Sequence, residues 1–192
     1  MDAEAVPGGA VVHDAAYIDI VFDGRAPQSF LATPGAQEVG VEMWSMSKTY
    51  GMAGWRIGFV VGNAEIVERI NLFNDHSRVG IFAPLQAAAI AALEGPQDSV
   101  KERVEAYRRR RDVMASALPE PPVCEGTFFM WTRLPDGLTA DRLLVEERVA
   151  VAPGEGFGPS GERWARLSLA VSDETIELGA ERLHRAFAAV AA

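Results

Sequence analysis

The residues best suited to chemistry lie in one short stretch of the chain. Lys48 and Arg56 stand eight positions apart in WSMSKTYGMAGWRIGFVVG, among small, hydroxyl and aromatic side chains. A desolvated lysine amine is a nucleophile that condenses with an aldehyde. An arginine presents a fixed fork of N–H donors that suits a phosphate group. The apolar setting predicts that both cations are buried and that a covalently held, phosphate-bearing cofactor neutralises them.

Three apolar runs are predicted to be the strands that position these residues: 10–13, 39–45 and 56–62. The runs are mostly continuous rather than alternating, which is typical of strands buried on both faces of an α/β sheet. Ligands of open α/β sheets collect at the carboxyl ends of strands. Asp14 follows the first strand and the SMSK segment follows the second. If the third strand runs antiparallel to its neighbour, Arg56 returns to the same rim.

Helical patterns follow these strands. Asn63 is predicted to cap a helix that continues to residue 76, and an alanine-rich helix covers 83–95. A long amphipathic helix over 96–118 ends at the proline cluster PEPP. We therefore predict a parallel-type α/β region over 1–95 and a linking helix over 96–118.

The pattern beyond the proline cluster, over 119–192, predicts a small α+β domain. GTFFMWTRL and WARLSLA are predicted strands, VAVAP is a short strand, and TADRLLVEE is a helix. A terminal helix begins at SDET, where Ser172 and Asp173 are placed to cap it.

Composition narrows the class of protein. The 192 residues carry a formal net charge of −9, which argues against a nucleic-acid surface. The basic run YRRRRD is predicted to be a solvated helix face. A single cysteine, Cys124, favours a reducing compartment and is interpreted as a small apolar filler. No apolar run is long enough to span a membrane, and the acidic N-terminal segment has no signal-peptide core. We expect a cytoplasmic protein with no metal site.

The residue types suit a site for pyridoxal 5'-phosphate (PLP). Lys48 can condense with the cofactor aldehyde. Asp14 can pair with the pyridine nitrogen and keep it protonated, so that the ring acts as an electron sink. Tyr17, three positions later, can hydrogen-bond the phenolic oxygen of the ring. The alternatives are a surface lysine, a turn or cap acid, and a core aromatic.

Three further residues are candidates for the phosphate group. Ser45 and Ser47 can donate hydrogen bonds to phosphate oxygens, and Arg56 can clamp the phosphate. Ser47 could instead cap the turn. His76 could line a pocket or a subunit contact, although a satisfied core histidine is the simpler interpretation.

The two stretches resemble the central block of the class I/II, fold type I PLP-dependent aminotransferases. HDAAYIDIVFDG followed by WSMSKTYGMAGWRIGFVVGN contains Asp-x-x-Tyr, then Ser-x-Ser-Lys, then an arginine eight residues after the lysine. The resemblance implies the roles that the residue types suggest, with Lys48 as the Schiff-base lysine and proton shuttle.

The resemblance continues beyond the long helix. GTFFMWTRLP is similar to the first strand of the family's small domain, and WARLSLAVSDETIELGAERL to the segment whose arginine binds the substrate α-carboxylate. That arginine falls on Arg166, although a surface ion pair near Arg163 is an alternative. The stretch PGEGFGPSGE is predicted to be a turn-rich loop near the substrate rather than a phosphate loop.

For the chain as a whole, the resemblance implies the C-terminal half of such an enzyme. Residues 1–95 would be the C-terminal part of the PLP-binding large domain, a mostly parallel sheet with flanking helices. The implied function is amino-group transfer from an amino acid to a 2-oxo acid, of diaminopimelate, alanine or aspartate type, in a homodimer.

The family's upstream elements are not found before Asp14. We therefore expect a truncated product, a fragment or one half of a split protein, with a sheet edge and an apolar face left uncovered. Two other functions stay open. One is another PLP reaction on the same fold, such as C–S lysis or decarboxylation. The other is an inactive fragment that acts as an interaction or dimerisation module through the helix at 83–95.

Overall fold

The computed structural model describes residues 9–120 and 122–191. The chain divides into two compact units, the first comprising Met1–Ile20 and Arg25–Lys101, the second Val21–Gly24 and Glu102–Ala192. The acidic N-terminal segment, residues 1–8, and Pro121 of the predicted proline boundary lie outside the described residues. The predicted division of the chain at residues 95 and 118 stays a prediction.

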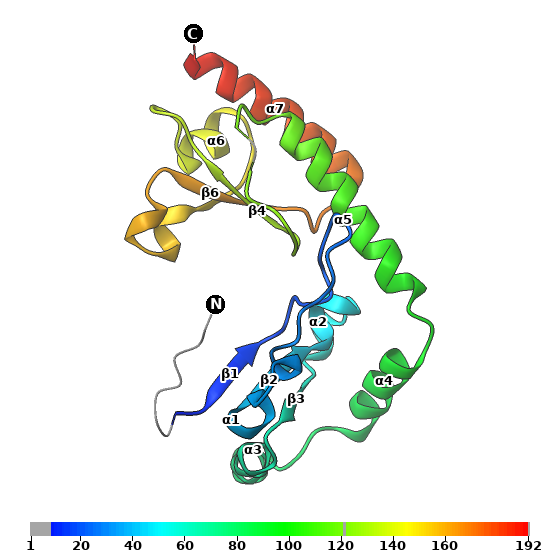
Figure 1. Cartoon of the computed structure of the whole chain (residues 1–192). Coiled ribbons are helices and arrows are strands. Elements are labelled where there is room, and N and C mark those ends of the chain that lie inside the picture. Colours follow the sequence, from blue (N-terminus) through cyan, green and yellow to red (C-terminus); the bar gives the residue numbers. More distant parts are fainter. Residues whose placement is uncertain (1–8, 121, 192) are drawn as a thin grey trace. The chain divides into compact units, whose positions relative to one another are not determined.

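The first unit is built on the strands β1 (Val11–Asp14), β2 (Gly40–Ser45) and β3 (Gly58–Gly62) (Figure 1). β1 runs parallel to β2, whereas β3 runs antiparallel to it, with Gly58 opposite Ser45. A side chain at Gly58 would collide with the carbonyl oxygen of Trp44, so only glycine lets the strands approach here. The three predicted strands are confirmed with shifted bounds. The condition that the third strand runs antiparallel to its neighbour is also met.

In the described part of this unit, four α-helices accompany the sheet: α1 (Ala36–Val39), α2 (Met46–Thr49), α3 (Ala64–Arg78) and α4 (Ala83–Glu94). The predicted cap of α3 is confirmed, since Asn63 Oδ1 accepts a hydrogen bond from the Ile66 amide at 3.1 Å. Neither α1 nor α2 was predicted, because four residues are too few to show a helical period.

Much of the apolar surface of the first unit is uncovered. α3 contains no buried residue, and Phe73, Val79 and Phe82 are 70%, 92% and 70% exposed. Among the described residues, one small buried cluster of this unit consists of Met46, Ile57 and Ala89, with partly buried side chains packed against it. In the described sheet, β1 and β3 each lack a neighbour on one side. The uncovered edge and apolar face expected from the sequence are therefore present.

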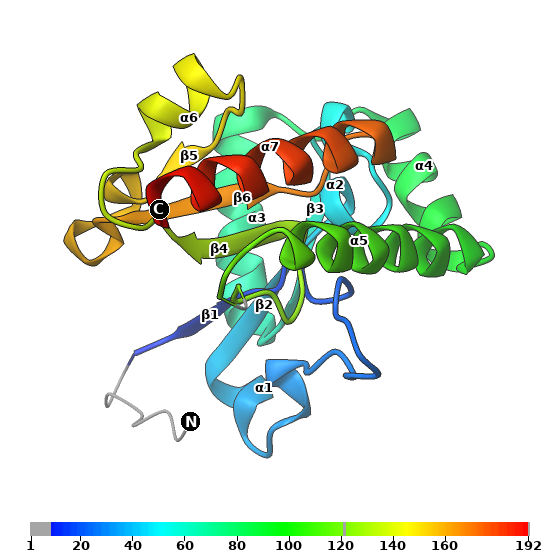
Figure 2. The same ribbon diagram turned by 90° about the horizontal axis from the view of Figure 1, so that it is seen from above.

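The second unit contains a three-stranded antiparallel sheet, in which β6 (Trp164–Ser168) lies between β4 (Phe129–Arg133) and β5 (Ala152–Pro153). Its helices are the greater part of α5 (Asp98–Ser116), α6 (Ala140–Glu146) and α7 (Asp173–Ala191). α5 and α7 lie side by side (Figure 2), and their apolar faces form one core with alternate residues of β4 and β6. The predicted order of strands and helices is confirmed.

The glycine-rich stretch between β5 and β6 forms two short 3-10 turns, η3 (Gly154–Phe157) and η4 (Pro159–Gly161). A Cβ atom at Gly154 or Gly161 would collide with the backbone of the other, so both positions require glycine. The predicted turn-rich loop is therefore correct as local structure. Among the described helices, none combines the length and the apolar character needed to cross a membrane.

The basic run on α5 is solvated only in part. The side chain of Arg109 is 56% exposed, but those of Arg110 and Arg111 are 21% and 14% exposed. Arg110 pairs with Asp173 and Arg111 with Asp23, each at 2.5 Å. The prediction of a solvated face is wrong for these two arginines, because residues distant in sequence bring carboxylates against the helix.

Candidate cofactor site

Lys48 lies on α2, a single helical turn that follows β2 directly. Ser45, the last residue of β2, caps this turn, since its Oγ accepts a hydrogen bond from the Ser47 amide at 3.2 Å. Met46, Ser47 and Thr49 are buried, whereas Lys48 is half-buried. The turn thus leaves Lys48 partly exposed, and the cap that sequence reasoning gave to Ser47 belongs to Ser45.

Asp14 is the last residue of β1, and Tyr17 lies on the segment that follows this strand. Because β1 and β2 are parallel, with Asp14 opposite Met43, their carboxyl ends share one rim of the sheet. Asp14 Oδ1 accepts a hydrogen bond from the Ala16 amide at 3.1 Å, so the residue stabilises a turn. Lys48 Nζ lies 5.3 Å from the centre of the Tyr17 ring. The structure therefore places the lysine amine close to the phenol ring.

Arg56 is exposed, contrary to the sequence prediction that both cations are buried. It lies before β3 in a left-handed conformation, with φ 52°, and its Nη1 donates a hydrogen bond to the Ala53 carbonyl oxygen at 3.0 Å. This conformation interrupts the extended run, which explains why the strand begins at Gly58 rather than at the arginine. β3 runs antiparallel to β2, so the residue still lies near the rim that carries Ser45.

The turn that carries Lys48 is tied to its surroundings by two side-chain hydrogen bonds. Thr49 Oγ1 donates to Asp19 Oδ2 at 2.8 Å, and the Tyr50 hydroxyl donates to Gln97 Oε1 at 2.9 Å. Burial and the nearby charge of Asp19 raise the pKa of Tyr50, against a smaller opposing effect of its bond to Gln97. These contacts were not predicted, since they join residues 30 and 47 positions apart.

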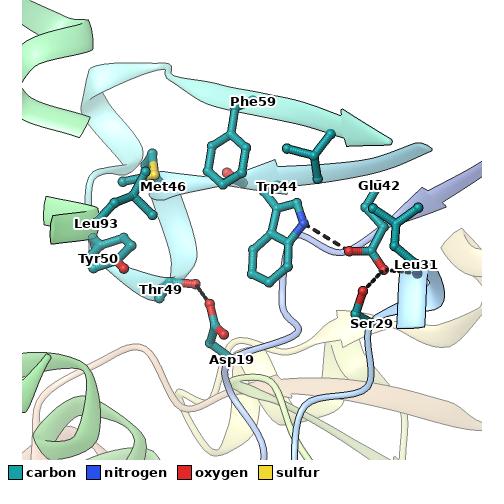
Figure 3. A pocket seen from close by; sticks show the side chains of 12 residues that line it. Asp19, Ser29, Leu31, Glu42, Trp44, Met46, Thr49, Tyr50, Phe59 and Leu93 are labelled. Atoms are coloured by element: carbon teal, nitrogen blue, oxygen red, sulfur yellow. Dashed lines mark hydrogen bonds between the residues drawn. The ribbon is translucent and has the colours of Figure 1, made fainter. Parts of the chain in front are cut away.

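A cavity of about 390 Å³ lies beside this turn, on the face of the sheet that carries Trp44 and Phe59 (Figure 3). The rings of Trp44 and Phe59 are stacked, with centroids 5.9 Å apart. The polar side of the cavity includes Glu42, which is 1% exposed. Sequence reasoning missed this carboxylate, although a lone acid within the apolar run VGVEMWS is a signal of a buried, hydrogen-bonded group.

Three donors and a histidine ring nitrogen surround the Glu42 carboxylate. Ser29 Oγ donates to Oε1 at 2.9 Å, the Leu31 amide donates to the same oxygen at 3.3 Å, and Trp44 Nε1 donates to Oε2 at 3.2 Å. His13 Nδ1 lies 3.1 Å from Oε1. Burial opposes the charged form, but these hydrogen bonds outweigh it and lower the pKa of Glu42. The residue thereby fixes β1, the Ser29–Leu31 segment and β2 to one another.

Arg166 belongs to the second unit. Its guanidinium lies 4.1 Å from the centre of the Phe129 ring and 4.6 Å from that of Phe157. Within the described residues it makes no ion pair, whereas the neighbouring Arg163 pairs with Asp136 at 2.5 Å. The ion pair that sequence reasoning left open for Arg166 therefore falls on Arg163.

Residues 3–183 match the model of the family described as aminotransferase class I and II. The chain belongs to this family. It is 44% identical over 184 residues to the L-glutamine–4-(methylsulfanyl)-2-oxobutanoate aminotransferase of Bacillus subtilis, covering 92% of this chain and 46% of that protein. It is 43% identical over 182 residues to an LL-diaminopimelate aminotransferase of Dehalococcoides mccartyi, covering 91% and 47%.

The solved structure of apo-BacF from Bacillus subtilis matches the fold with a TM-score of 0.85 and 36% identity, over 93% of this chain and 48% of that one. The chain therefore spans about half the length of the relatives and structures it matches. The predicted family and the predicted partial fold type I architecture are both confirmed.

Class I and II aminotransferases depend on PLP, and the donor set at the rim fits this cofactor. The carboxylate of Asp14 ends β1, the phenol of Tyr17 and the amine of Lys48 lie on the segments that follow β1 and β2, and the exposed residue Arg56 precedes β3. The individual roles of Asp14, Tyr17, Ser45, Ser47, Lys48, Arg56 and Arg166 stay predictions.

The structure also describes the surroundings of His76 and Cys124. His76 is exposed in the last turn of α3, so its interpretation as a core histidine is wrong. Cys124 is half-buried, and desolvation raises the pKa of its thiol to about 11. A thiol held protonated in this way is a poor nucleophile, which agrees with its interpretation as a filler.

Proposed function

We propose that this chain forms the lysine-bearing part of a PLP-dependent aminotransferase, which moves an amino group from an amino acid to a 2-oxo acid. One observation carries the proposal. Lys48 Nζ lies 5.3 Å from the centre of the Tyr17 ring, at the rim where the parallel strands β1 and β2 end. The family supplies the reaction class, and this arrangement supplies the residues that would perform it.

The proposed roles follow from the side-chain chemistry. When bound, PLP supplies an aldehyde that accepts amines and a ring that withdraws electrons from the substrate α-carbon. Lys48 Nζ holds the cofactor between turnovers and transfers the α-proton of the substrate. Asp14 keeps a pyridine nitrogen protonated, and Tyr17 donates to an oxygen of the ring.

The anionic groups would be held by donors on separate elements. Ser45, Ser47 and the exposed guanidinium of Arg56 suit a phosphate. Arg166, flanked by two aromatic rings and without an ion pair among the described residues, suits the substrate α-carboxylate. A bidentate arginine selects for the carboxylate that every amino acid and 2-oxo acid carries.

The amino donor is proposed to be of diaminopimelate, alanine or aspartate type. Two relatives support an amino acid as the donor but do not determine which one. One relative is named for diaminopimelate, and the other for glutamine and a methylsulfanyl oxo acid. Donors are best compared by pairing each with 2-oxoglutarate or pyruvate. Amino-group transfer requires the 2-oxo acid, whereas C–S lysis or decarboxylation consumes the donor without it.

The sequence offers a matched test of Lys48, because Lys101 is its only other lysine. The side chain of Lys101 is 77% exposed and pairs with Asp98 at 3.5 Å. The purified chain is incubated with PLP, reduced with borohydride and mapped by peptide mass. The adduct is expected on Lys48, absent in Lys48→Ala and retained in Lys101→Ala. Equal labelling of the two lysines, or no adduct at all, would contradict cofactor binding by this chain.

The proposed assembly is a homodimer in the cytoplasm. The uncovered apolar residues of α3, α4 and their connection support an assembly of some kind, since monomers rarely expose so many. The same surface favours one alternative function, an interaction or dimerisation module without catalysis. Sedimentation measures the oligomeric state, and a chain that self-associates but never forms the Lys48 adduct would support this alternative.

A further inference from the structure

The one-turn helix that carries Lys48 is too short to hold its own position. α2 contains four residues, and isolated helices of this length are unstable. The conformational entropy lost in forming the first turn exceeds the stabilisation that its single hydrogen bond provides. Its internal bond, from the Tyr50 amide to the Met46 carbonyl oxygen, measures 3.2 Å. The position of the lysine therefore depends on tertiary contacts of the residues beside it.

Thr49 provides such a contact immediately after the lysine. Its side chain is 5% exposed, and its hydroxyl donates to the Asp19 carboxylate at 2.8 Å. This bond joins two buried or half-buried groups and has an anionic acceptor, which makes it one of the stronger kinds of hydrogen bond in proteins. Figure 3 shows the two side chains pointing toward each other across the edge of the cavity.

Asp19 lies on the segment that also carries Tyr17. Two backbone turns shape this segment, with the Ile18 amide donating to Ala15 at 3.1 Å and the Ile20 amide donating to Tyr17 at 2.9 Å. The carboxylate and the phenol therefore belong to one folded turn, two positions apart. The contact between Thr49 and Asp19 is thus adjacent to the contact between Lys48 and Tyr17.

We propose that Asp19 and Thr49 are positioning residues that hold Lys48 beside Tyr17. Neither side chain would touch the cofactor or the substrate. Their hydrogen bond fixes the α2 turn to the turn after β1, so that the lysine amine keeps its distance from the phenol. The functional meaning of this inference rests on the proposed role of Lys48, but the structural link is testable without it.

The test uses hydrogen exchange of the full chain, with Thr49→Val as the main variant. Valine keeps the branched shape and removes the hydroxyl. Thr49→Ser keeps the hydroxyl and is the conservative rescue. Thr33→Val, at an exposed threonine of the same unit, makes the same chemical change away from α2.

In Thr49→Val, the Tyr50 amide is expected to exchange about tenfold faster, while the amides of the β2–β3 ladder are unchanged. Thr49→Ser should restore most of the protection, and Thr33→Val should have no effect. Unchanged exchange at Tyr50 would overturn the proposal. So would equal acceleration across the unit, because that result indicates general destabilisation rather than local positioning.

If Thr49→Val does not fold, a second variant tests the same hydrogen bond from the acceptor side. Asp19→Asn retains an oxygen acceptor but removes its charge, and a smaller acceleration of about threefold is expected at the Tyr50 amide. No acceleration in this variant would count against the proposal.

A second measurement separates this inference from the proposed function. The affinity of each variant for PLP is titrated through the visible absorbance of the lysine-bound cofactor, and Thr49→Val should bind several times more weakly than Thr33→Val. If the unchanged chain binds no PLP, the proposed function fails, and the exchange data alone decide whether Asp19 and Thr49 position the turn. If all variants bind PLP equally, the link between this bond and Lys48 is refuted.

Discussion

Replacement of Glu42 by glutamine is the sharpest test of how the lysine-bearing strand is held. The wild-type carboxylate accepts from Ser29, Leu31 and Trp44, with His13 Nδ1 3.1 Å away. Glutamine has nearly the same shape but only one accepting oxygen. If that oxygen replaces Oε1, the amide NH2 group faces the indole N–H of Trp44, and two donors oppose each other.

The expected cost follows from these contacts. A buried donor left without a partner costs about 1–3 kcal/mol, and the remaining bonds lose the roughly twofold strength of a charged acceptor. Removing a buried charge offsets part of this loss. We expect Glu42→Gln to lower the free energy of unfolding of the first unit by about 3 kcal/mol.

Urea unfolding followed by circular dichroism and tryptophan fluorescence measures this change. Glu38→Gln is the matched control, because Glu38 is an exposed acid of the same unit, and it should change stability by less than about 0.5 kcal/mol. A loss of less than about 1 kcal/mol for Glu42→Gln would refute the argument. That outcome would mean that the donors around the carboxylate find other partners.

Three further predictions concern groups described above. The pKa of Glu42 is lower in the folded than in the unfolded chain, so the ionised carboxylate stabilises the fold fully above the ordinary pKa of 4.5, and this stabilisation is lost as the pH falls through the folded-state pKa. The difference in unfolding free energy between wild type and Glu42→Gln should therefore shrink in acid. A difference that stays constant with pH would contradict this prediction. Arg111→Ala should destabilise the second unit by about 3 kcal/mol, because the Arg111 side chain is largely buried in its ion pairs. Arg109→Ala should cost less than about 0.5 kcal/mol, because the Arg109 side chain is mostly exposed. Equal losses of stability for the two variants in thermal unfolding would argue against this prediction. Finally, iodoacetamide at pH 8 should label Cys124 about a hundredfold more slowly in the folded chain than in urea, because burial raises the thiol pKa to about 11. Equal labelling rates in the two states would show that folding does not protect the thiol.

Local patterns predicted the elements of this fold well. Asn63 and Ser172 were identified as helix caps from residue type and position alone, and both accept the expected backbone hydrogen bond. Caps are predictable because donor and acceptor lie within three residues of each other. The same locality explains the correct strands, since hydrophobic runs and glycines mark them directly.

The surroundings of the candidate site were less predictable. The sequence identified Lys48 and Tyr17, and the structure brings them close. It did not reveal Asp19 or Glu42, whose partners lie far along the chain, and it predicted a buried Arg56 that is exposed. Apolar neighbours in sequence are a poor guide to burial where the backbone turns, because a left-handed residue redirects the side chain.

Val21–Gly24 belongs to the second unit although the residues on either side of it belong to the first. The polypeptide passes between the units three times, after Ile20, after Gly24 and after Lys101. No single cut can therefore release either unit whole. A C-terminal fragment beginning at Glu102 would leave Arg111 without Asp23, and a four-residue peptide would have to be grafted onto it before its folding could be compared fairly with that of the intact chain.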